Sequence, residues 1–496
     1  MIVFALKRML VVAAFCLINI AIYAQTNQPV TLTQDEKTAT LSNSQVVLVV
    51  AKLTGNILSL KYLGTEMMGH GGGYWVTLGD ITNKPVTQAV SMPSVFSVTK
   101  DPAKNKGDIG EMSIRFPYHG QEGVLPMNIE IRYTLHRNDS AIYGWTILDH
   151  APTYPAFNIP LSDFTMKLNA DVFDFLSIDS ARQKLMPTSE EWVNGTELNM
   201  KEARRINSGP HAGEVEHKYD YNMLLSEVPA YGWSSTKRNI GLFIVNPSIE
   251  YLNGGPVMVD YQAHIDVKPK LPADPTLLFD WHTPHYGGKK IEIKATDSWQ
   301  KVVGPFLIYA NQGSSTHAMW QDALARVEKE KKAWPYAWAD AKGYEHKSQR
   351  GSAAGKLQVH DPHAPKASPA GAWIGLAHAP YQVNLNGVPT TFDWQLDGKY
   401  YQYWGRVDAK GNFTIPNARP GTYVLYAFNN GILGDYSKAN VTIRAGKTAQ
   451  LGTLKWVPER NGKQLWEIGI PNRSAEEFRH GDHYWQWGLY NLYPQE

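Results

Sequence analysis

The chain has 496 residues, a length that usually divides into two or three domains, and its formal net charge is +2 at pH 7. This near-neutral balance excludes a strongly basic nucleic-acid-binding surface and strong electrostatic attachment to a membrane. With 16 Trp and 26 Tyr, the composition favours a β-protein whose flat rings stack on sugars or fill a core.

The N-terminus has the pattern of a secretory signal peptide. Lys7 and Arg8 precede an apolar run over residues 9–22, and a small residue follows before a polar stretch. The run is too short for a comfortable membrane span, so we expect cleavage and export, with a retained anchor as the alternative. The only cysteine, Cys16, lies in this run, so the mature chain must rely on a large core rather than on disulfides.

Residues 30–308 consist of short alternating or apolar runs separated by Gly, Asn, Pro and Asp. Clear examples are 45–51, 57–62 and 240–245. Many short strands at this spacing predict a large antiparallel β-sandwich. No fixed-period repeat indicates a propeller or a solenoid.

A helix is predicted after this region, over residues 317–333. Ser or Thr at 314–316 provides the N-cap, and Pro335 ends the helix. Its apolar stripe consists of Met319, Trp320, Ala323, Leu324 and Val327. Residues 342–352 are polar and contain glycine, which predicts a linker. Residues 371–456 again have strand patterns, over the length of a small immunoglobulin-like or fibronectin-like sandwich.

The last segment, residues 465–494, is dense in Trp, Tyr, Gly and His and poor in aliphatic residues. It is not typical of an ordinary amphipathic helix or strand. It resembles the segment that opens the third domain of the rhamnogalacturonan lyases of polysaccharide lyase family 4. The chain ends shortly afterwards, at Glu496.

The second β region carries the most specific resemblance to this family. Its motifs look like successive motifs of the family's fibronectin-like domain: Ala372-Trp-Ile-Gly-Leu-Ala377, Tyr400-Tyr-Gln-Tyr-Trp404, Asp408-Ala-Lys-Gly-Asn-Phe413, Arg419-Pro-Gly-Thr-Tyr-Val-Leu-Tyr-Ala427 and Gly434-Asp-Tyr436. Looser matches in the first region resemble the family's catalytic sandwich: Asp139-Ser-Ala-Ile-Tyr-Gly-Trp145, Asp179-Ser-Ala-Arg-Gln-Lys-Leu-Met-Pro187, His217-Lys-Tyr-Asp-Tyr221, Tyr251-Leu-Asn-Gly-Gly-Pro256 and Thr283-Pro-His-Tyr-Gly287.

The resemblance implies a mainly β fold. It consists of a large galactose-mutarotase-like antiparallel β-sandwich, a fibronectin type III-like β-sandwich, and the truncated start of a third carbohydrate-binding-like jelly-roll module. The corresponding domains are a signal peptide at 1–24, the catalytic sandwich at 25–345, the fibronectin-like domain at 346–457 and the incomplete third domain at 458–496.

The same resemblance implies an enzyme, a secreted or periplasmic rhamnogalacturonan endolyase. It would cleave the rhamnose–galacturonate backbone of rhamnogalacturonan I, a pectic polysaccharide, by β-elimination. This reaction needs a base for the C5 proton, stabilisation of charge on the carboxylate, and an acid for the leaving oxygen. The implied catalytic residues are Lys218 as the base and His285 as the acid or charge stabiliser.

Lys218 needs a special environment to act as a base. A free lysine has a pKa near ~10.4, so only about 0.4% of it is neutral at pH 8. Burial or a neighbouring cation, such as Arg204 or Arg205, must therefore lower that pKa to ~7–8, or a bulge must re-aim the side chain. If residues 214–221 form a strand, three carboxylates share the face of Lys218 and oppose this shift. They are Glu214, Glu216 and Asp220.

His285 has a close competitor in His282 for the acid role. A histidine can be cationic near pH 7 beside a uronate. Asp280, His282 and His285 also offer a metal-binding alternative, although we predict no metal at the site and no cofactor for catalysis. A structural calcium ion elsewhere is left open.

The sequence departs from the family pattern at Asp163, where fungal and plant relatives place a substrate-holding Arg. Lys167 or Arg182 is the predicted replacement. The remaining substrate-binding residues implied by the resemblance are Tyr219, Tyr221, Gly254, Gly255 and His282.

Two alternatives to the lyase remain. One is a non-catalytic carbohydrate-binding protein on the same scaffold, and the other is an epimerase or hydrolase of the mutarotase-like type. A hydrolase would need two opposed carboxylates, for which Glu190, Glu191, Glu214 and Glu216 are candidates. The expected partner is the pectic polysaccharide, with no nucleic acid or membrane, and we expect a monomer. Because residues 466–493 would expose an aromatic patch, we also predict low solubility, which light scattering can test.

Overall fold

The structure is a computed structural model that describes residues 28–471, apart from short gaps at 82–83, 88–92, 199–202, 267–273, 284, 286–289, 386, 463–464 and 467. The predicted signal peptide lies outside the described residues. So does the aromatic-rich part of the predicted third domain from 472 onward. In the described part of the chain, no helix has both the length and the hydropathy needed to cross a membrane.

The first large sheet is antiparallel and has the strand order β1-β2-β3-β4-β6-β12-β23-β22. Three short strands each pair with one of these strands: β5 with β4, β7 with β6, and β24 with β12. Its strands are β1 (Thr31–Gln34), β2 (Thr38–Ser42), β3 (Val46–Ala51), β4 (Ile57–Tyr62), β5 (Thr65–Glu66), β6 (Met68–Ile81), β7 (Lys84–Thr87), β12 (Phe157–Leu168), β22 (Ala263–Asp266), β23 (Asp274–His282) and β24 (Ile291–Ile293).

The second large sheet has the order β14-β13-β19-β20-β25-β11-β10-β9-β8. Its strands are β8 (Val95–Lys100), β9 (Ile109–Phe116), β10 (Asn128–His136), β11 (Ala141–His150), β13 (Phe175–Ser177), β14 (Gln183–Leu185), β19 (Ala230–Ser234), β20 (Ile240–Val245) and β25 (Trp299–Gln312).

Aromatic side chains join the two sheets into a sandwich. Phe306 of β25 contacts Trp75, Phe164 and Phe279 of the other sheet, at ring-centroid distances of 5.7, 5.6 and 4.4 Å. Such tilted pairs add to the free energy gained by removing the rings from water. The predicted large antiparallel sandwich is confirmed.

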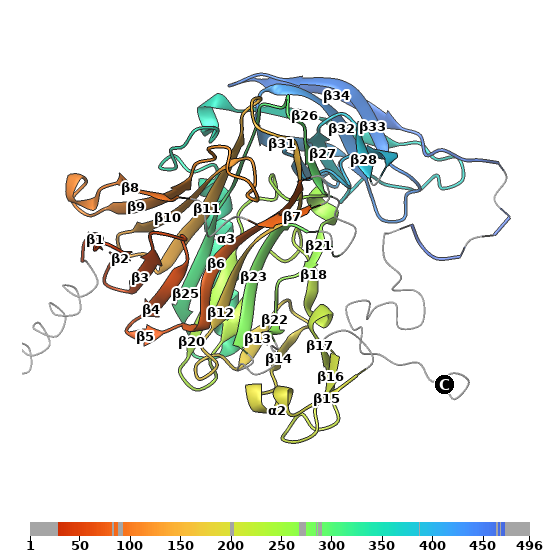
Figure 1. Cartoon of the computed structure of the whole chain (residues 1–496). Coiled ribbons are helices and arrows are strands. Elements are labelled where there is room, and N and C mark those ends of the chain that lie inside the picture. The colour runs from red at the N-terminus through yellow and green to blue at the C-terminus, as the bar shows by residue number, and fades with distance from the viewer. Residues whose placement is uncertain are drawn as a thin grey trace, which may run out of the picture.

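Helix α3 (Thr316–Ala333) packs on the second sheet (Figure 1). Its N-cap is Ser315, whose hydroxyl accepts a hydrogen bond from the Ala318 amide at 3.1 Å. On the apolar stripe, the Trp320 indole donates to the Ala230 carbonyl of β19 at 3.2 Å. The predicted helix is therefore confirmed in position, cap and buried face. Other helical segments include η1 (Pro102–Lys104), α2 (Ser189–Val193) and η4 (Lys347–Gln349).

A second, smaller sandwich follows at one end of the molecule, with its strands in the blue part of Figure 1. Its sheets have the orders β31-β26-β34 and β30-β27-β32-β33, and β28 and β29 form a hairpin. Strand β26 lies parallel to β34. The strands are β26 (Gly351–Val359), β27 (Trp373–Ala377), β28 (Tyr381–Leu385), β29 (Val388–Phe392), β30 (Tyr403–Arg406), β31 (Asn412–Ala418), β32 (Gly421–Phe428), β33 (Tyr436–Ile443) and β34 (Thr448–Trp456).

The two sandwiches are joined by buried polar contacts rather than by a free linker. Arg350 forms hydrogen bonds with both carboxylate oxygens of Glu250, at 2.7 and 3.0 Å. The backbone amide of Gln402 donates to the Glu250 carbonyl at 2.9 Å, and the Trp299 indole donates to the Lys399 carbonyl at 3.0 Å. Residues 342–352, predicted to be a linker, do connect the two sandwiches, but Arg350 within them is buried in the interface.

Short elements beside β23 build the region described next. They are β15 (Thr196–Glu197), β16 (Ala203–Arg205), β17 (Val215–His217), η2 (Lys218–Tyr221), β18 (Asn222–Leu224), η3 (Gly255–Val257) and β21 (Val259–Tyr261). Strands β15, β16 and β17 form one small sheet, and β18 pairs with β21 in another. Turn η2 packs against β21 and β22. A turn between two small sheets is thereby held against the first large sheet.

Candidate active site

Three buried carboxylates come together from separate strands. Asp163 of β12 stands opposite Asp280 of β23 in the sheet register. Asp260 comes from β21, where it pairs with Met223 of β18. Asp163 is 5% exposed, Asp260 is 0% exposed and Asp280 is 1% exposed. Buried carboxylates are costly unless they are protonated or face positive charge, so this group marks a candidate functional site.

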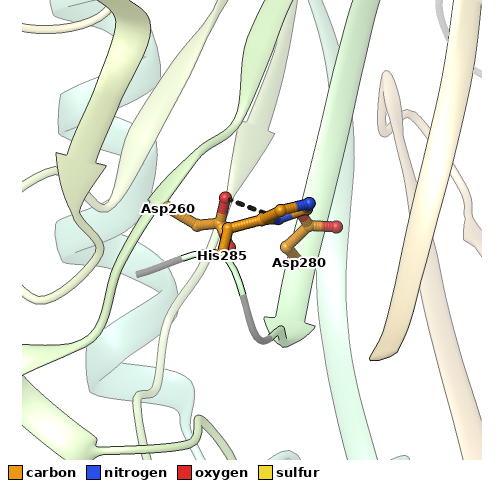
Figure 2. A group of neighbouring side chains, drawn as sticks. All are labelled: Asp260, Asp280 and His285. Atoms are coloured by element: carbon orange, nitrogen blue, oxygen red, sulfur yellow. Dashed lines mark ion pairs between the residues drawn. The ribbon is translucent and has the colours of Figure 1, made fainter. Parts of the chain in front are cut away.

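His285 completes the group from the loop that follows β23. Its Nδ1 atom lies 3.4 Å from Asp260 Oδ1 and 2.7 Å from the hydroxyl of Thr283. One donor atom each of Asp260, Asp280 and His285 lie within 4.8 Å of one another. Figure 2 shows the two aspartates approaching the imidazole from different strands. A protonated His285 in this position makes a charge-assisted contact with Asp260.

The turn that contains Lys218 lies beside His285. Strand β17 ends at His217, whose Nδ1 accepts a hydrogen bond from the Tyr219 amide at 3.3 Å. Lys218 then begins η2, and the ring of Tyr219 lies edge-on to the ring of His285 at 6.2 Å between centroids. The structure thus brings the backbone of Lys218 next to the Asp260–His285 pair. The side chain of Lys218 lies outside the described residues.

The strand alternation considered for residues 214–221 is interrupted at Lys218, where the backbone enters the turn. Of the carboxylates on that stretch, Glu214 accepts from Lys184 at 3.1 Å and the buried Glu216 also contacts Lys184. Burial alone would lower the pKa of Lys184, but the charge and hydrogen bonds of Glu216 and Glu214 raise it. These two carboxylates therefore have a cation of their own.

Several predicted substrate-binding residues are held by the protein itself. Tyr221 is 6% exposed and its hydroxyl contacts Glu216 and the sulfur of Met186. His282 is 0% exposed and its Nε2 lies 2.9 Å from the Ile159 carbonyl. Burial lowers the pKa of His282 to about 3, so this imidazole is neutral at physiological pH. The structure groups Asp260, rather than His282, with Asp280 and His285. The substrate-binding roles of Tyr219, Tyr221 and His282 stay predictions.

Lys167 and Arg182, the predicted replacements for the missing Arg, border the site. Lys167 is 6% exposed and donates to the Thr276 hydroxyl at 3.1 Å. Arg182 forms an ion pair with Asp179 at 2.6 Å and donates to the Asp220 carbonyl at 3.3 Å, which supports η2. Their contact with a substrate stays a prediction.

Gly254 and Gly255 lie where the second sandwich meets the first. Both have positive φ, 70° and 52°, a region that favours glycine. A Cβ on Gly255 would lie 2.5 Å from Gln402 Oε1 and 2.7 Å from Trp404 Nε1. The glycines therefore permit close approach of the two sandwiches, and their cleft-shaping role stays a prediction.

The carboxyl of Asp163 has a strongly raised pKa. Burial raises the pKa of its carboxyl to about 7, and the charge of Asp260 acts in the same direction. The Thr165 hydroxyl, which donates at 2.9 Å, and the charges of Lys167 and His285 oppose the shift. Asp163 thus holds a proton under conditions in which an exposed aspartate is ionised.

We expect Asp163→Asn to stabilise the protein at pH 8 by on the order of 3 kcal/mol. Because the folded-state pKa lies above the unfolded value, the folded protein binds more protons between about pH 4 and pH 7, and the free energy of unfolding falls as pH rises through that window. Asparagine does not titrate, so the variant loses this pH dependence of stability, and its side-chain oxygen still accepts from the Thr165 hydroxyl. The urea unfolding midpoints of both proteins at pH 5 and pH 8 measure the difference. Equal pH dependence in both proteins would contradict the assignment.

The donor set Asp260, Asp280 and His285 suits a divalent cation in ligand type, since carboxylate oxygen and imidazole nitrogen bind Mn²⁺ or Zn²⁺. The 3.4 Å separation of Asp260 Oδ1 and His285 Nδ1 also fits a simple ion pair. The three side chains can therefore either form an ion pair through a protonated His285 or bind a divalent cation.

Two family models match the chain. The model of the Rhamnogalacturonate lyase family matches residues 17–212, and that of Polysaccharide lyase family 4, domain II matches residues 369–451. Both matched regions are therefore similar to rhamnogalacturonate lyases. The first match covers Asp163, Lys167 and Arg182, whereas Lys218, Asp260 and His285 lie beyond its end.

Known members of the rhamnogalacturonate lyase family are similar to the chain at moderate identity. The rhamnogalacturonate lyase of Dickeya dadantii is 29% identical over 271 residues, covering 54% of this chain and 41% of that protein. The probable rhamnogalacturonate lyase B of Aspergillus flavus is 24% identical over 501 residues, covering 93% of this chain and 70% of that protein. The chain thus spans less than half of the Dickeya protein and more than two thirds of the Aspergillus flavus protein.

Among solved structures, the galactose mutarotase related enzyme of Lactobacillus acidophilus is similar over 57% of this chain and 99% of that chain, with 12% identity and a TM-score of 0.30. The architecture of this chain is described from its own strand pairing.

Sequence reasoning missed Asp260. The signal available for Asp260 was its place in the short strand Val259–Tyr261. An aspartate is seldom fully buried unless it is paired. Thr283 was also missed, because a threonine two residues before a histidine carries no specific pattern.

Proposed function

We propose that this chain is a polysaccharide lyase that cleaves the rhamnose–galacturonate backbone of rhamnogalacturonan I by β-elimination. The similarity of two regions of the chain to rhamnogalacturonate lyases supports the reaction class. The observation that carries the assignment to this site is the contact of Tyr219 with His285, which sets the turn of Lys218 beside the Asp260–His285 pair. We also propose that the protein is secreted or periplasmic and acts as a monomer.

In this mechanism Lys218 removes the C5 proton of a galacturonate, and His285 protonates the leaving O4 oxygen. Asp260 and Thr283 hold the imidazole through Nδ1, so the ring keeps one orientation during proton transfer. An imidazolium beside the substrate carboxylate then offsets the charge that develops there.

A hydrolase receives less support from the geometry. Its candidate carboxylates Glu214 and Glu216 both face Lys184, and Glu191 caps helix α2 by accepting from the Thr188 amide at 2.7 Å. A glycosidase needs one carboxylic acid and one carboxylate on opposite sides of the bond. The lyase therefore remains the first proposal, with a binding protein as the second.

The test is ultraviolet absorbance of the unsaturated uronate during incubation with rhamnogalacturonan I, with homogalacturonan as the control polymer. We expect a rise with rhamnogalacturonan I alone. A flat trace, with the polymer still retained in a pull-down, would replace the lyase with a carbohydrate-binding protein. New reducing ends without absorbance would instead indicate a hydrolase.

We expect EDTA to change the rate by less than about twofold, because general acid–base catalysis by Lys218 and His285 requires no metal. The measurement is the initial rate of absorbance with and without EDTA, followed by addition of Ca²⁺ or Mn²⁺. Loss of activity with EDTA and its recovery with either ion would contradict the metal-free mechanism. It would assign Asp260, Asp280 and His285 as ligands.

A further inference from the structure

A cavity of about 330 Å³ lies where the two sandwiches meet. Both modules contribute to its lining, with Asn246 and Trp334 from the first and Trp373 and Trp404 from the second. Its described lining residues do not include Asp163, Asp260, Asp280 or His285. The cavity is therefore distinct from the candidate active site.

Two tryptophans on neighbouring strands line the cavity with aromatic rings that are held in place by packing. Trp404 of β30 lies opposite Gly375 of β27, where a Cβ would come within 2.2 Å of the indole, so the ring lies flat against the sheet. Its Nε1 donates to Gln402 at 2.9 Å. The Arg406 guanidinium covers the ring of Trp373 at 3.6 Å. Both indoles are half-buried and fixed, and rigid aromatic faces of this kind pack on the C–H groups of sugar rings.

Asn246 supplies a buried polar group to the same cavity. It is 2% exposed, and its Oδ1 accepts from the Tyr251 hydroxyl at 2.5 Å. Its Nδ2 has no hydrogen-bond partner among the described residues. An unsatisfied buried amide is costly, and a ligand hydroxyl that accepts from it would remove that cost.

The charges around the cavity are already paired. Glu250 is bound by Arg350, and Lys331 at the rim forms an ion pair with Glu328 at 3.1 Å. The lining thus offers aromatic faces and an amide donor, without an uncompensated cation for a carboxylate. We propose that the interdomain cavity binds one neutral pyranose unit of a polysaccharide. This inference does not depend on the lyase activity.

The experiment is ¹⁹F NMR of the whole protein labelled with 5-fluorotryptophan, titrated with the methyl glycosides of galactose and rhamnose. Trp→Phe variants assign the resonances of Trp373, Trp404 and Trp338. At least one glycoside should shift Trp373 and Trp404 with a Kd on the order of 1 mM, as is usual for a ligand of this size. Trp338, a half-buried tryptophan at another cavity, should not shift.

Variants then locate the site. Trp373→Ala should raise the Kd at least tenfold, because it removes an aromatic face. Asn246→Ala should raise the Kd by a similar factor, because it removes the amide donor. The matched control Trp338→Ala should leave the Kd unchanged. No shift with either sugar at tens of millimolar would overturn the proposal, as would equal weakening by Trp338→Ala. Equally tight binding of methyl galacturonate would overturn the neutral ligand class. Because every readout is binding, a failed lyase assay leaves these outcomes intact.

Discussion

Lys218→Ala is expected to lower the rate of unsaturated-uronate formation by about 10²–10⁴-fold, the usual contribution of a positioned general base. The polymer should still bind, because Lys218 acts on the C5 proton rather than holding the chain. Initial rates of ultraviolet absorbance and a pull-down with rhamnogalacturonan I measure the two effects separately.

Two further variants sharpen this result. Lys218→Arg keeps the positive charge but cannot release its proton in this pH range, so it should be as inactive as the alanine variant. Lys237→Ala, at an exposed lysine between β19 and β20, should retain the wild-type rate. An active Lys218→Arg enzyme would show that charge, rather than basicity, is what the reaction needs, and Lys218 would lose its role as base.

Glu250→Ala is expected to lower the free energy of unfolding by about 3–5 kcal/mol, the usual cost of breaking a buried ion pair. Glu250 is 5% exposed and Arg350 is 2% exposed. Burial alone would raise the pKa of the Glu250 carboxyl, but the Arg350 guanidinium outweighs it and holds the pKa below its usual value. Removal of Glu250 leaves Arg350 buried without its counter-charge. Urea unfolding followed by circular dichroism measures the loss.

The control pair is Lys342 and Asp149, which form an exposed ion pair at 3.2 Å. Lys342→Ala should change stability by less than about 1 kcal/mol. The double variant Glu250→Ala with Arg350→Met should recover part of the lost stability, since the uncompensated charge is gone. A Glu250→Ala protein within about 1 kcal/mol of the wild type would show that the interface does not depend on this pair.

Local patterns predicted the regular elements well. The runs 57–62 and 240–245 coincide with β4 and β20. Their apolar residues pack into one core, so they determine how long each strand is and which of its faces is buried. Helix α3 was predicted with its cap for the same reason. The strand considered for residues 214–221 covers only Val215–His217, since the buried His217 accepts from the Tyr219 amide and the chain turns at Lys218.

The site itself depends on distant pairings that one sequence does not reveal. Asp163 and Asp280 meet only because β12 and β23 are neighbours in a particular register. Asp260 joins them through β21, a strand outside the large sheets. Lys218 and His285 were predicted from the family resemblance, and nothing in spacing or composition would have joined them to Asp260.

The parallel pairing of β26 with β34 has a mechanical consequence. These are the first and last strands of the second sandwich, and they run side by side from Ser352↔Thr448 to Val359↔Trp456. A pull on the two ends of this module therefore loads the hydrogen bonds between the strands together, in shear, rather than opening them one after another. The module should therefore resist a pull on its two ends better than one whose terminal strands separate one hydrogen bond at a time.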